Sequence, residues 1–223
     1  MRFPDDSLPL LSARQHRRLD ELAEALAGLT PLALMETASQ RAAEAIRNDF
    51  AGAQRARVLV GPGNNGGDGL GVARWLSLWG WQIEWVDWPS PRAANPAVAS
   101  MRRALELCPV RRRCFGDPLE PGSLLIDAWL GTGLRRPLEL PLEDWIVALG
   151  TRPDMAAATT LALDLPSGLE CDADKAQGPF VQARRTYSFA GRKRILEAGH
   201  GGAVRYLSLG IPEGVYRALL AEG

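Results

Sequence analysis

The stretch GPGNNGGDG, residues 61–69, directly follows the apolar run Val58–Val60. It contains the spelling G-x-G-x-x-G at Gly61, Gly63 and Gly66. A glycine-rich turn between a strand and a helix is typical of α/β folds that bind the phosphates of nucleotides. The two asparagines and Asp68 in the same stretch fit that purpose poorly, because a carboxylate beside a pyrophosphate would repel it.

Apolar runs alternate with helical patterns on both sides of this stretch. Upstream, Ser12 and Gln15 have the spacing of a capping box, and Thr30-Pro31 marks the start of a second helix that runs to about residue 49. We predict the later helices near 69–79, 95–107, 142–149 and 215–220, and the strands near 57–60, 81–87, 110–115, 124–126, 160–163, 186–189 and 204–209. Strands that alternate with helices predict a parallel sheet covered on both faces.

The composition is that of an ordinary globular protein. Of the 223 residues, 46% are hydrophobic and 23% are charged, and we expect one domain over residues 1–223. The 26 basic and 26 acidic residues balance, so no net charge attracts nucleic acid or a membrane, and the run 111–113 of arginines is expected to be a solvated edge. The three cysteines lack metal-ligand spacing, and no stretch is long enough to span a bilayer, so we expect a cytoplasmic protein.

Three predicted strands end in polar loops that contain glycine. Val60 leads into GPGNNGGDG, Ile126 into DAWLGTGLRRPLELP, and Leu163 into DLPSGLECD. In an open parallel sheet, the carboxyl ends of the strands lie along one edge, where ligands bind. We therefore expect one cleft near Asp68, Asp127 and Asp164. As plain alternatives, Asp68 caps a helix, while Asp127, Asp164 and Ser167 only form turns.

An ordinary dinucleotide-binding site is the first alternative. Glu84 or Asp87 lies where an acid that binds ribose is expected. However, a lone G-x-G-x-x-G is a weak signal, and Asp68 stands where the pyrophosphate would lie. A dehydrogenase also needs a site for hydride transfer, and the sequence offers none. A P-loop is excluded, because no Gly-Lys-Ser/Thr follows.

Three motifs together resemble one known family. GPGNNGGDGLGVARWL, DAWLGTGLRRPLELP and LDLPSGLECD look like the N-terminal domain of the YjeF family, the NAD(P)H-hydrate epimerases. The LMETA stretch at 34–38 and SFAGRK at 188–193 match in order and spacing. The resemblance implies a three-layer α/β/α sandwich with a Rossmann-like, mostly parallel sheet and two N-terminal helices. It also implies an isomerase for nicotinamide-nucleotide repair, which interconverts the R and S forms of hydrated NADH and NADPH.

The resemblance also assigns functional residues. It implies one potassium ion per subunit, held by Asn65, Asp127 and Ser167. Asp164 would contact the substrate near the reacting ring. The substrate-binding residues would be Asn64, Asn65, Gly66, Gly67, Asp68, Gly131, Thr132, Gly133, Leu134, Arg135, Arg136, Pro137 and Asp164.

These residue types suit that chemistry. An amide oxygen, a carboxylate and a hydroxyl are ligands that a large monovalent cation accepts. Glycines let backbone N–H groups approach an anionic ligand closely, and Arg135 and Arg136 are placed for phosphate contacts. Protonating the C6 hydroxyl of the substrate lets the ring nitrogen expel water, which leaves a planar cation that water re-enters from either face. One carboxyl group that donates and accepts a proton would serve, and Asp164 is our candidate.

The chain departs from the family pattern in two places. M-E-N-A-G is common in the family, and here Thr37 and Ser39 replace its Asn and Gly; Lys193 is followed by Arg194 rather than Pro. Lys193 matches a family lysine, but a solvated lysine fits the sequence as well. We expect structural or surface positions for His16 and His200.

The resemblance leaves several partners and one other function class open. Many bacterial members fuse this domain to an ADP- or ATP-dependent NAD(P)H-hydrate dehydratase, so the chain is either a standalone epimerase or a piece of such a protein. A homodimer is also compatible with the resemblance. The alternative function is a non-catalytic nucleotide- or protein-binding module, because the same fold resembles domains in an mRNA-decapping scaffold and in an apolipoprotein-binding protein.

Overall fold

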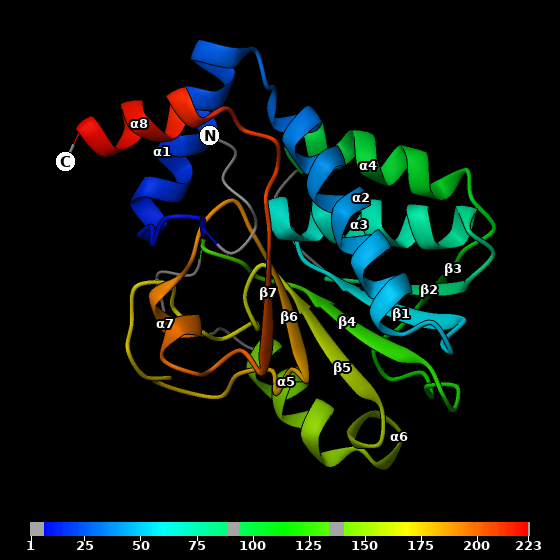
Figure 1. Ribbon diagram of the computed structural model, residues 1–223. Coiled ribbons are helices and arrows are strands. Elements are labelled where there is room, and N and C mark those ends of the chain that lie inside the picture. Colours follow the sequence, from blue (N-terminus) through cyan, green and yellow to red (C-terminus); the bar gives the residue numbers. More distant parts are fainter. Residues whose placement is uncertain (1–6, 89–93, 134–140, 223) are drawn as a thin grey trace.

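The structure, a computed structural model, describes residues 7–88, 94–133 and 141–222 (Figure 1). Within these residues seven strands form one parallel sheet in the order β3-β2-β1-β4-β5-β6-β7. The order reverses between β1 and β4, which is where open α/β sheets bind ligands. The strands are β1 Arg55–Val60, β2 Gln82–Asp87, β3 Arg111–Arg113, β4 Leu124–Ala128, β5 Thr159–Leu163, β6 Arg185–Phe189 and β7 Ala203–Leu207.

Helices cover both faces of the sheet, so the predicted α/β/α sandwich is confirmed. Helices α2, α3 and α4 lie on one face and α5 and α6 on the other, while α1 packs beside α8 (Figure 1). The helices are α1 Ala13–Ala27, α2 Pro31–Asp49, α3 Asn64–Leu78, α4 Pro96–Glu106, α5 Leu142–Thr151, α6 Pro153–Ala156, α7 Arg194–Glu197 and α8 Glu213–Ala221. None of the described helices has the length and apolar character needed to cross a membrane.

The alternation of side chains along β1 supplies both halves of the core. Val58 and Val60 join the buried cluster beneath α2, α3 and α4, whereas Leu59 joins the cluster beneath α5 with Trp129 and Ile146. Successive residues of a strand face opposite sides of the sheet, so the apolar run Val58–Val60 of this strand needs cover on both faces.

The predicted starts of the two N-terminal helices are confirmed. The Ser12 side chain accepts a hydrogen bond from the Gln15 N–H, and the Gln15 side chain accepts one from the Ser12 N–H. Thr30 caps α2 at Ala33, with Pro31 in the first turn. The short helices α6 and α7 have four residues each and were not predicted, because one turn is too short to show a helical period.

Helix α3 begins at Asn64, five residues before the predicted start, so most of the glycine-rich stretch is helical. A Cβ on Gly66 would lie 1.9 Å from the Gly61 carbonyl oxygen, so only glycine allows this close approach of α3 to the loop after β1. The helix is capped at Gly63 without a side-chain hydrogen bond, and Asp68 lies one turn further in. The alternative that Asp68 is a helix cap is therefore wrong.

The two acids considered for a ribose instead bind arginines. The Glu84 carboxylate accepts hydrogen bonds from Arg57, which is 1% exposed, and from Arg113. Asp87 pairs with Arg102 and Arg112. These pairs hold β1, β2 and the edge strand β3 together, and the arginine run of β3 is the solvated edge that was predicted.

Candidate active site

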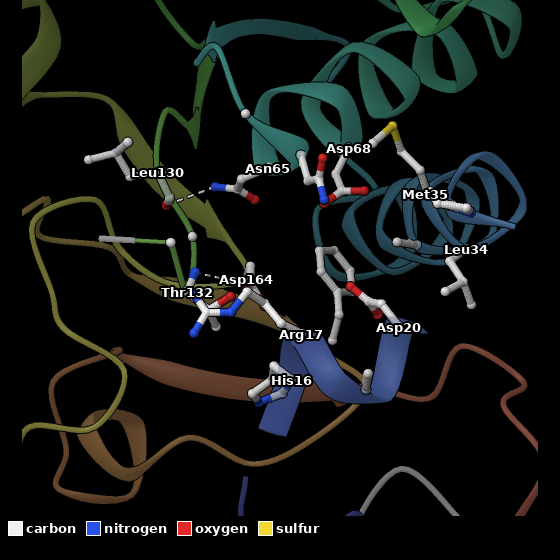
Figure 2. A pocket seen from close by; sticks show the side chains of 18 of the residues that line it. His16, Arg17, Asp20, Leu34, Met35, Asn65, Asp68, Leu130, Thr132 and Asp164 are labelled. Carbon is white, nitrogen blue, oxygen red and sulfur yellow. Dashed lines mark hydrogen bonds between the residues drawn. The ribbon is translucent and has the colours of Figure 1, made fainter. Parts of the chain in front are cut away.

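A pocket of about 460 Å³ opens at the carboxyl ends of β1, β4 and β5 (Figure 2). These three strands are neighbours in the sheet, so the loops that follow them meet. Among the predicted site residues, those that line the pocket are Asn64, Asn65, Asp68, Gly131, Thr132, Gly133 and Asp164.

The remaining predicted substrate residues lie elsewhere. Gly66 and Gly67 are buried in α3 and do not line the pocket; Gly67 packs against the Met35 side chain. Leu134, Arg135, Arg136 and Pro137 lie outside the described residues.

Helix α1 lines the pocket with side chains that the sequence analysis did not select. His16, Arg17 and Asp20 come from this helix, while Leu34, Met35 and Ala38 come from α2. His16 and Asp20 are four residues apart and so share one face of α1. His16 is only 8% exposed, and its Nε2 atom has no hydrogen-bond partner in the described parts of the chain. A buried histidine on the apolar face of a helix is the signal that could have identified this side of the pocket.

The Asp164 carboxylate is fixed from two sides. Its Oδ1 atom lies 2.8 Å from the Lys193 ammonium, and its Oδ2 atom accepts a hydrogen bond from the Thr132 N–H at 3.2 Å. Asp164 has a φ of 62°, in the left-handed region, and its N–H donates to the Tyr187 carbonyl. Aspartate tolerates this backbone conformation better than most residues, so the turn aims the carboxylate into the pocket.

Lys193 is fully buried, so the alternative of a solvated lysine is wrong. Its ammonium also donates to the Ser188 hydroxyl at 2.8 Å and to the Phe189 carbonyl at 3.1 Å. These partners come from the end of β6, next to β5 in the sheet, so the fold presents the cation to Asp164 at a set position.

The acidic groups of the pocket differ in charge state. Burial would raise the pKa of Asp164, but the Lys193 ammonium outweighs it and holds that pKa below its usual value. Burial and then the charge of Asp164 raise the pKa of Asp68 well above its usual value. Asp20 is an exposed residue of the pocket wall, but removal of water from around its carboxyl group and then the charge of Asp164 raise its pKa to about 6. Desolvation and then Lys193 lower the pKa of His16 to about 3, so this imidazole is neutral.

The three predicted potassium ligands meet around the backbone of Leu130. The Asn65 amide donates to the Leu130 carbonyl at 2.9 Å, and the Leu130 N–H donates to the Ser167 hydroxyl at 2.9 Å. The Ser167 hydroxyl donates to Asp127 Oδ1 at 2.7 Å. Asp127 is fully buried below the pocket rather than lining it, and burial raises its pKa to about 6 against the hydrogen bonds from Ser167.

The Oδ1 atom of Asn65 is buried, and no residue that the structure describes forms a hydrogen bond with it. A buried oxygen left in this state costs free energy unless an unseen donor or cation satisfies it. Within the described parts of the chain, no cluster of three or more His, Cys, Asp or Glu side chains could hold a metal ion. A set of amide, hydroxyl, carboxylate and backbone oxygens therefore suits a hard monovalent cation and does not suit a transition metal.

The residues that depart from the family pattern lie outside the pocket. The Thr37 hydroxyl donates to the Ala33 carbonyl of its own helix, and Thr37 does not line the pocket. The buried Ser39 hydroxyl donates to the Met35 and Asp68 carbonyls and so links α2 to α3. Arg194 pairs with Asp174 at the surface.

The sequence of residues 31–195 matches the family model described as YjeF-related protein N-terminus. The chain belongs to this family. It superposes on the crystal structure of the yeast protein ynu0 with a TM-score of 0.81 and 22% identity, over 95% of this chain and 93% of the yeast chain. That likeness confirms the fold.

Curated relatives of two lengths are similar to the chain. It is 28% identical to the NAD(P)H-hydrate epimerase of Rhodopirellula baltica, over 95% of this chain and 88% of the relative. It is 32% identical to the enzyme of the same name from Limosilactobacillus fermentum, over 86% of this chain and 91% of that relative. It is 36% identical to the bifunctional NAD(P)H-hydrate repair enzyme Nnr of Gloeobacter violaceus, over 96% of this chain but 42% of that relative. The chain therefore spans less than half of this longer, bifunctional relative.

Proposed function

We propose that the chain is an NAD(P)H-hydrate epimerase, which interconverts the R and S forms of hydrated NADH and NADPH. The observation that carries this proposal is the Asp164 carboxylate, held by Lys193 in a pocket built from the family's own loops. Relatives named as epimerases match over nearly their whole length, which supports the same activity for this chain.

The reaction needs a proton to move at the C6 hydroxyl of the substrate. Loss of water from C6 gives a planar cation, in which the ring nitrogen shares the positive charge, and water re-enters from either face. Asp164 is ionised and open to the pocket, so it can take a proton from the entering water or stabilise the planar cation. The opposite charge of Lys193 keeps Asp164 ionised without occupying the pocket.

The charges of the pocket indicate how the substrate lies. The first turn of α3 starts at Asn64, and its free backbone N–H groups attract anions. Asp20, Asp68 and Asp164 also line the pocket, and their carboxylates would repel phosphates. We therefore place the substrate phosphates toward the first turn of α3, and the uncharged hydrated ring toward the three aspartates.

A potassium ion fits the cluster of Asn65, Asp127 and Ser167. The unpartnered Asn65 Oδ1 is the observation that favours a cation there, and the Leu130 carbonyl adds a neighbouring oxygen. Bound there, the ion would supply positive charge beside the phosphate end of the pocket. It would also join the loops after β1, β4 and β5, while Asp127 supplies the balancing negative charge.

The activity is tested by incubating the protein with purified R epimer of hydrated NADPH and separating the epimers by chromatography. We expect the S epimer to appear faster than in buffer alone. Substrate binding without acceleration would instead support the non-catalytic binding module. A homodimer, a cytoplasmic location and a separate or fused dehydratase partner stay predictions; size-exclusion chromatography with light scattering tests the first of them.

A further inference from the structure

We propose that Asp20 of α1 is a second catalytic residue, which donates a proton to the C6 hydroxyl of the substrate while Asp164 accepts one from the entering water. The proposal rests on the epimerase activity proposed above. It assigns a proton-transfer role to a helix outside the family's glycine and aspartate motifs.

The position of Asp20 supports contact with the substrate. In Figure 2, His16 and Asp20 project from α1 toward the pocket, and Asn65 and Asp68 project from α3. No hydrogen bond or ion pair among the described residues occupies the Asp20 carboxyl group, so it is available to a ligand. Its charge interacts with that of Asp164, which places the two groups within one electrostatic environment.

Beside this aspartate, one unpaired buried atom indicates that a polar ligand belongs here. The His16 Nε2 atom is buried in the wall of the pocket and has no hydrogen-bond partner among the described residues. The substrate carries hydroxyl and carboxamide groups that can satisfy such an atom. Buried polar atoms that a protein leaves unpaired in a pocket are usually those that its ligand pairs.

The charge states of Asp20 and Asp164 indicate which of them donates the proton and which accepts it. Lys193 holds Asp164 in the ionised form, whereas Asp20 forms no ion pair with a described residue and keeps its proton to a higher pH. Two titratable groups whose surroundings push their pKa values apart are typical of an acid and base pair. The titratable and charged groups around Asp20 are His16, Arg17 and Glu21 of α1, Asp68 of α3, Tyr216 of α8, Asp164 and Lys193.

Asp20 suits the donor role better than Asp68. Burial and the charges of Asp164 and Asp20 raise the pKa of Asp68 well above its usual value, so it releases a proton less readily than an ordinary carboxyl group and would hold the ring through a hydrogen bond. Asp20 has a pKa of about 6, within reach of the working pH of an acid catalyst, and is an exposed residue that solvent can reprotonate after each turnover.

The proposed step is balanced in atoms and electrons. The Asp20 carboxylic acid gives its proton to the C6 hydroxyl oxygen, the C6–O bond breaks with its electron pair on the departing water, and the nitrogen lone pair forms an N1=C6 double bond. Water then adds to C6 from the opposite face, returns the double-bond electrons to nitrogen and gives its proton to Asp164. Solvent reprotonates Asp20 and takes the proton from Asp164. The reverse epimerisation exchanges the two roles.

The test compares full pH profiles of turnover for the wild type, Asp20→Asn, Asp20→Glu and Glu21→Gln, after subtraction of the spontaneous rate. Glu21 is the matched control, because it adjoins Asp20 on α1 but pairs with Arg18 outside the pocket. We expect the wild-type rate to fall as the pH rises past about 6, where Asp20 loses its proton. Asp20→Asn should lower kcat on the order of 10²–10³-fold, change KM far less and lose this decline in rate at high pH, the alkaline limb. Glu21→Gln should keep the wild-type kcat and the alkaline limb, displaced at most toward lower pH, because the Glu21 charge contributes to the raised pKa of Asp20.

Each other outcome has a defined meaning. An Asp20→Asn protein that melts like Glu21→Gln and turns over at the wild-type rate overturns the proposal, and so does a slower variant with an unchanged alkaline limb. If Asp20→Asn does not fold, Asp20→Glu decides the question: a displaced alkaline limb supports the proposal and an unmoved one overturns it. If the wild type shows no activity, the proposed function itself is wrong. The wild-type measurement alone decides this, before any variant is compared.

Discussion

The Lys193 ammonium and the Asp164 carboxylate lie 2.8 Å apart, and the lysine is wholly buried while the aspartate faces the pocket. The lysine therefore has no free path to solvent or substrate, and its charge acts through Asp164. Asp164 directly follows β5, and Lys193 lies between the adjacent strand β6 and helix α7. The parallel sheet thus keeps a carboxylate charged in a pocket that would otherwise protonate it.

Asp164→Asn should lower the rate of epimerisation on the order of 10²–10⁴-fold, as expected when a group that transfers protons is lost. Asparagine keeps the size of the side chain and tolerates the φ of 62°, so the backbone turn should survive. Turnover by chromatography of the epimers measures the loss. Asp174→Asn is the control, since Asp174 lies at the surface on Arg194; near-normal turnover in Asp164→Asn would rule out the role of Asp164.

Lys193→Met should raise the pKa of Asp164 and destabilise the fold. In the wild type the folded-state pKa of Asp164 is depressed, so the pair stabilises the protein above the ordinary carboxyl pKa, and this contribution is lost as the pH falls through the folded-state value. Without the lysine, an uncompensated carboxylate remains, at a cost of about 3–5 kcal/mol at neutral pH.

Urea unfolding at several pH values measures this effect. The stability difference between wild type and Lys193→Met should be largest at neutral pH and shrink in acid, where Asp164 is protonated in both proteins. The surface variant Lys175→Met controls for the loss of a positive charge. A difference independent of pH would show that Lys193 contributes through packing alone.

The sequence predicted the parallel sheet, the helices on both of its faces and the edge where the ligand binds. It did not predict where α3 begins. Strands β1 and β4 contain the apolar runs Val58–Val60 and Leu124–Ile126, and the carboxyl ends of the strands converge in any parallel sheet. Glycine favours loops by local propensity, so residues 64–68 resembled a loop. Tertiary packing reverses that preference, because Gly66 and Gly67 allow α3 to approach the Gly61 backbone and Met35.

The pocket wall formed by α1 was missed for a different reason. The spacing of residues in a predicted helix indicates which of them share a face, but it does not indicate which part of the sheet that face covers. His16 and Asp20 reach the pocket because α1 packs beside α8, far along the chain, and across the ends of the strands. Lys193 was ambiguous because a charged residue is usually exposed, and its burial depends on Asp164, Ser188 and the Phe189 carbonyl together.

Gly66→Ala should destabilise the protein by roughly 1–3 kcal/mol or more, because the added methyl group meets the backbone of Gly61, which no rotamer change can move. Gly63→Ala is the matched control: it lies in the same glycine-rich stretch, and a Cβ there meets no described atom within 4 Å. Thermal melting of both variants measures the difference. Equal melting temperatures would show that α3 does not pack this closely on the loop.

The potassium prediction is tested by melting the wild type in potassium buffer and in buffer with a bulky organic cation. An ion that binds only the folded state stabilises it, so the wild type should melt at a higher temperature in potassium. Asp127 also accepts hydrogen bonds from Trp129 and Ser167, so Asp127→Ala should lose stability in either buffer. The informative quantity is the gain on adding potassium, which should be present in the wild type and absent in Asp127→Ala.

Asp154→Ala provides the matched structural control for this comparison. Asp154 accepts a hydrogen bond from the Leu119 N–H and pairs with Arg152, away from the pocket. Its loss should lower the melting temperature equally in both buffers and leave the gain from potassium intact, because turn hydrogen bonds do not depend on the dissolved cation. If Asp127→Ala behaves as Asp154→Ala does, Asp127 only shapes the turn after β4, and the same assignment fails for Asn65 and Ser167, which share its cluster.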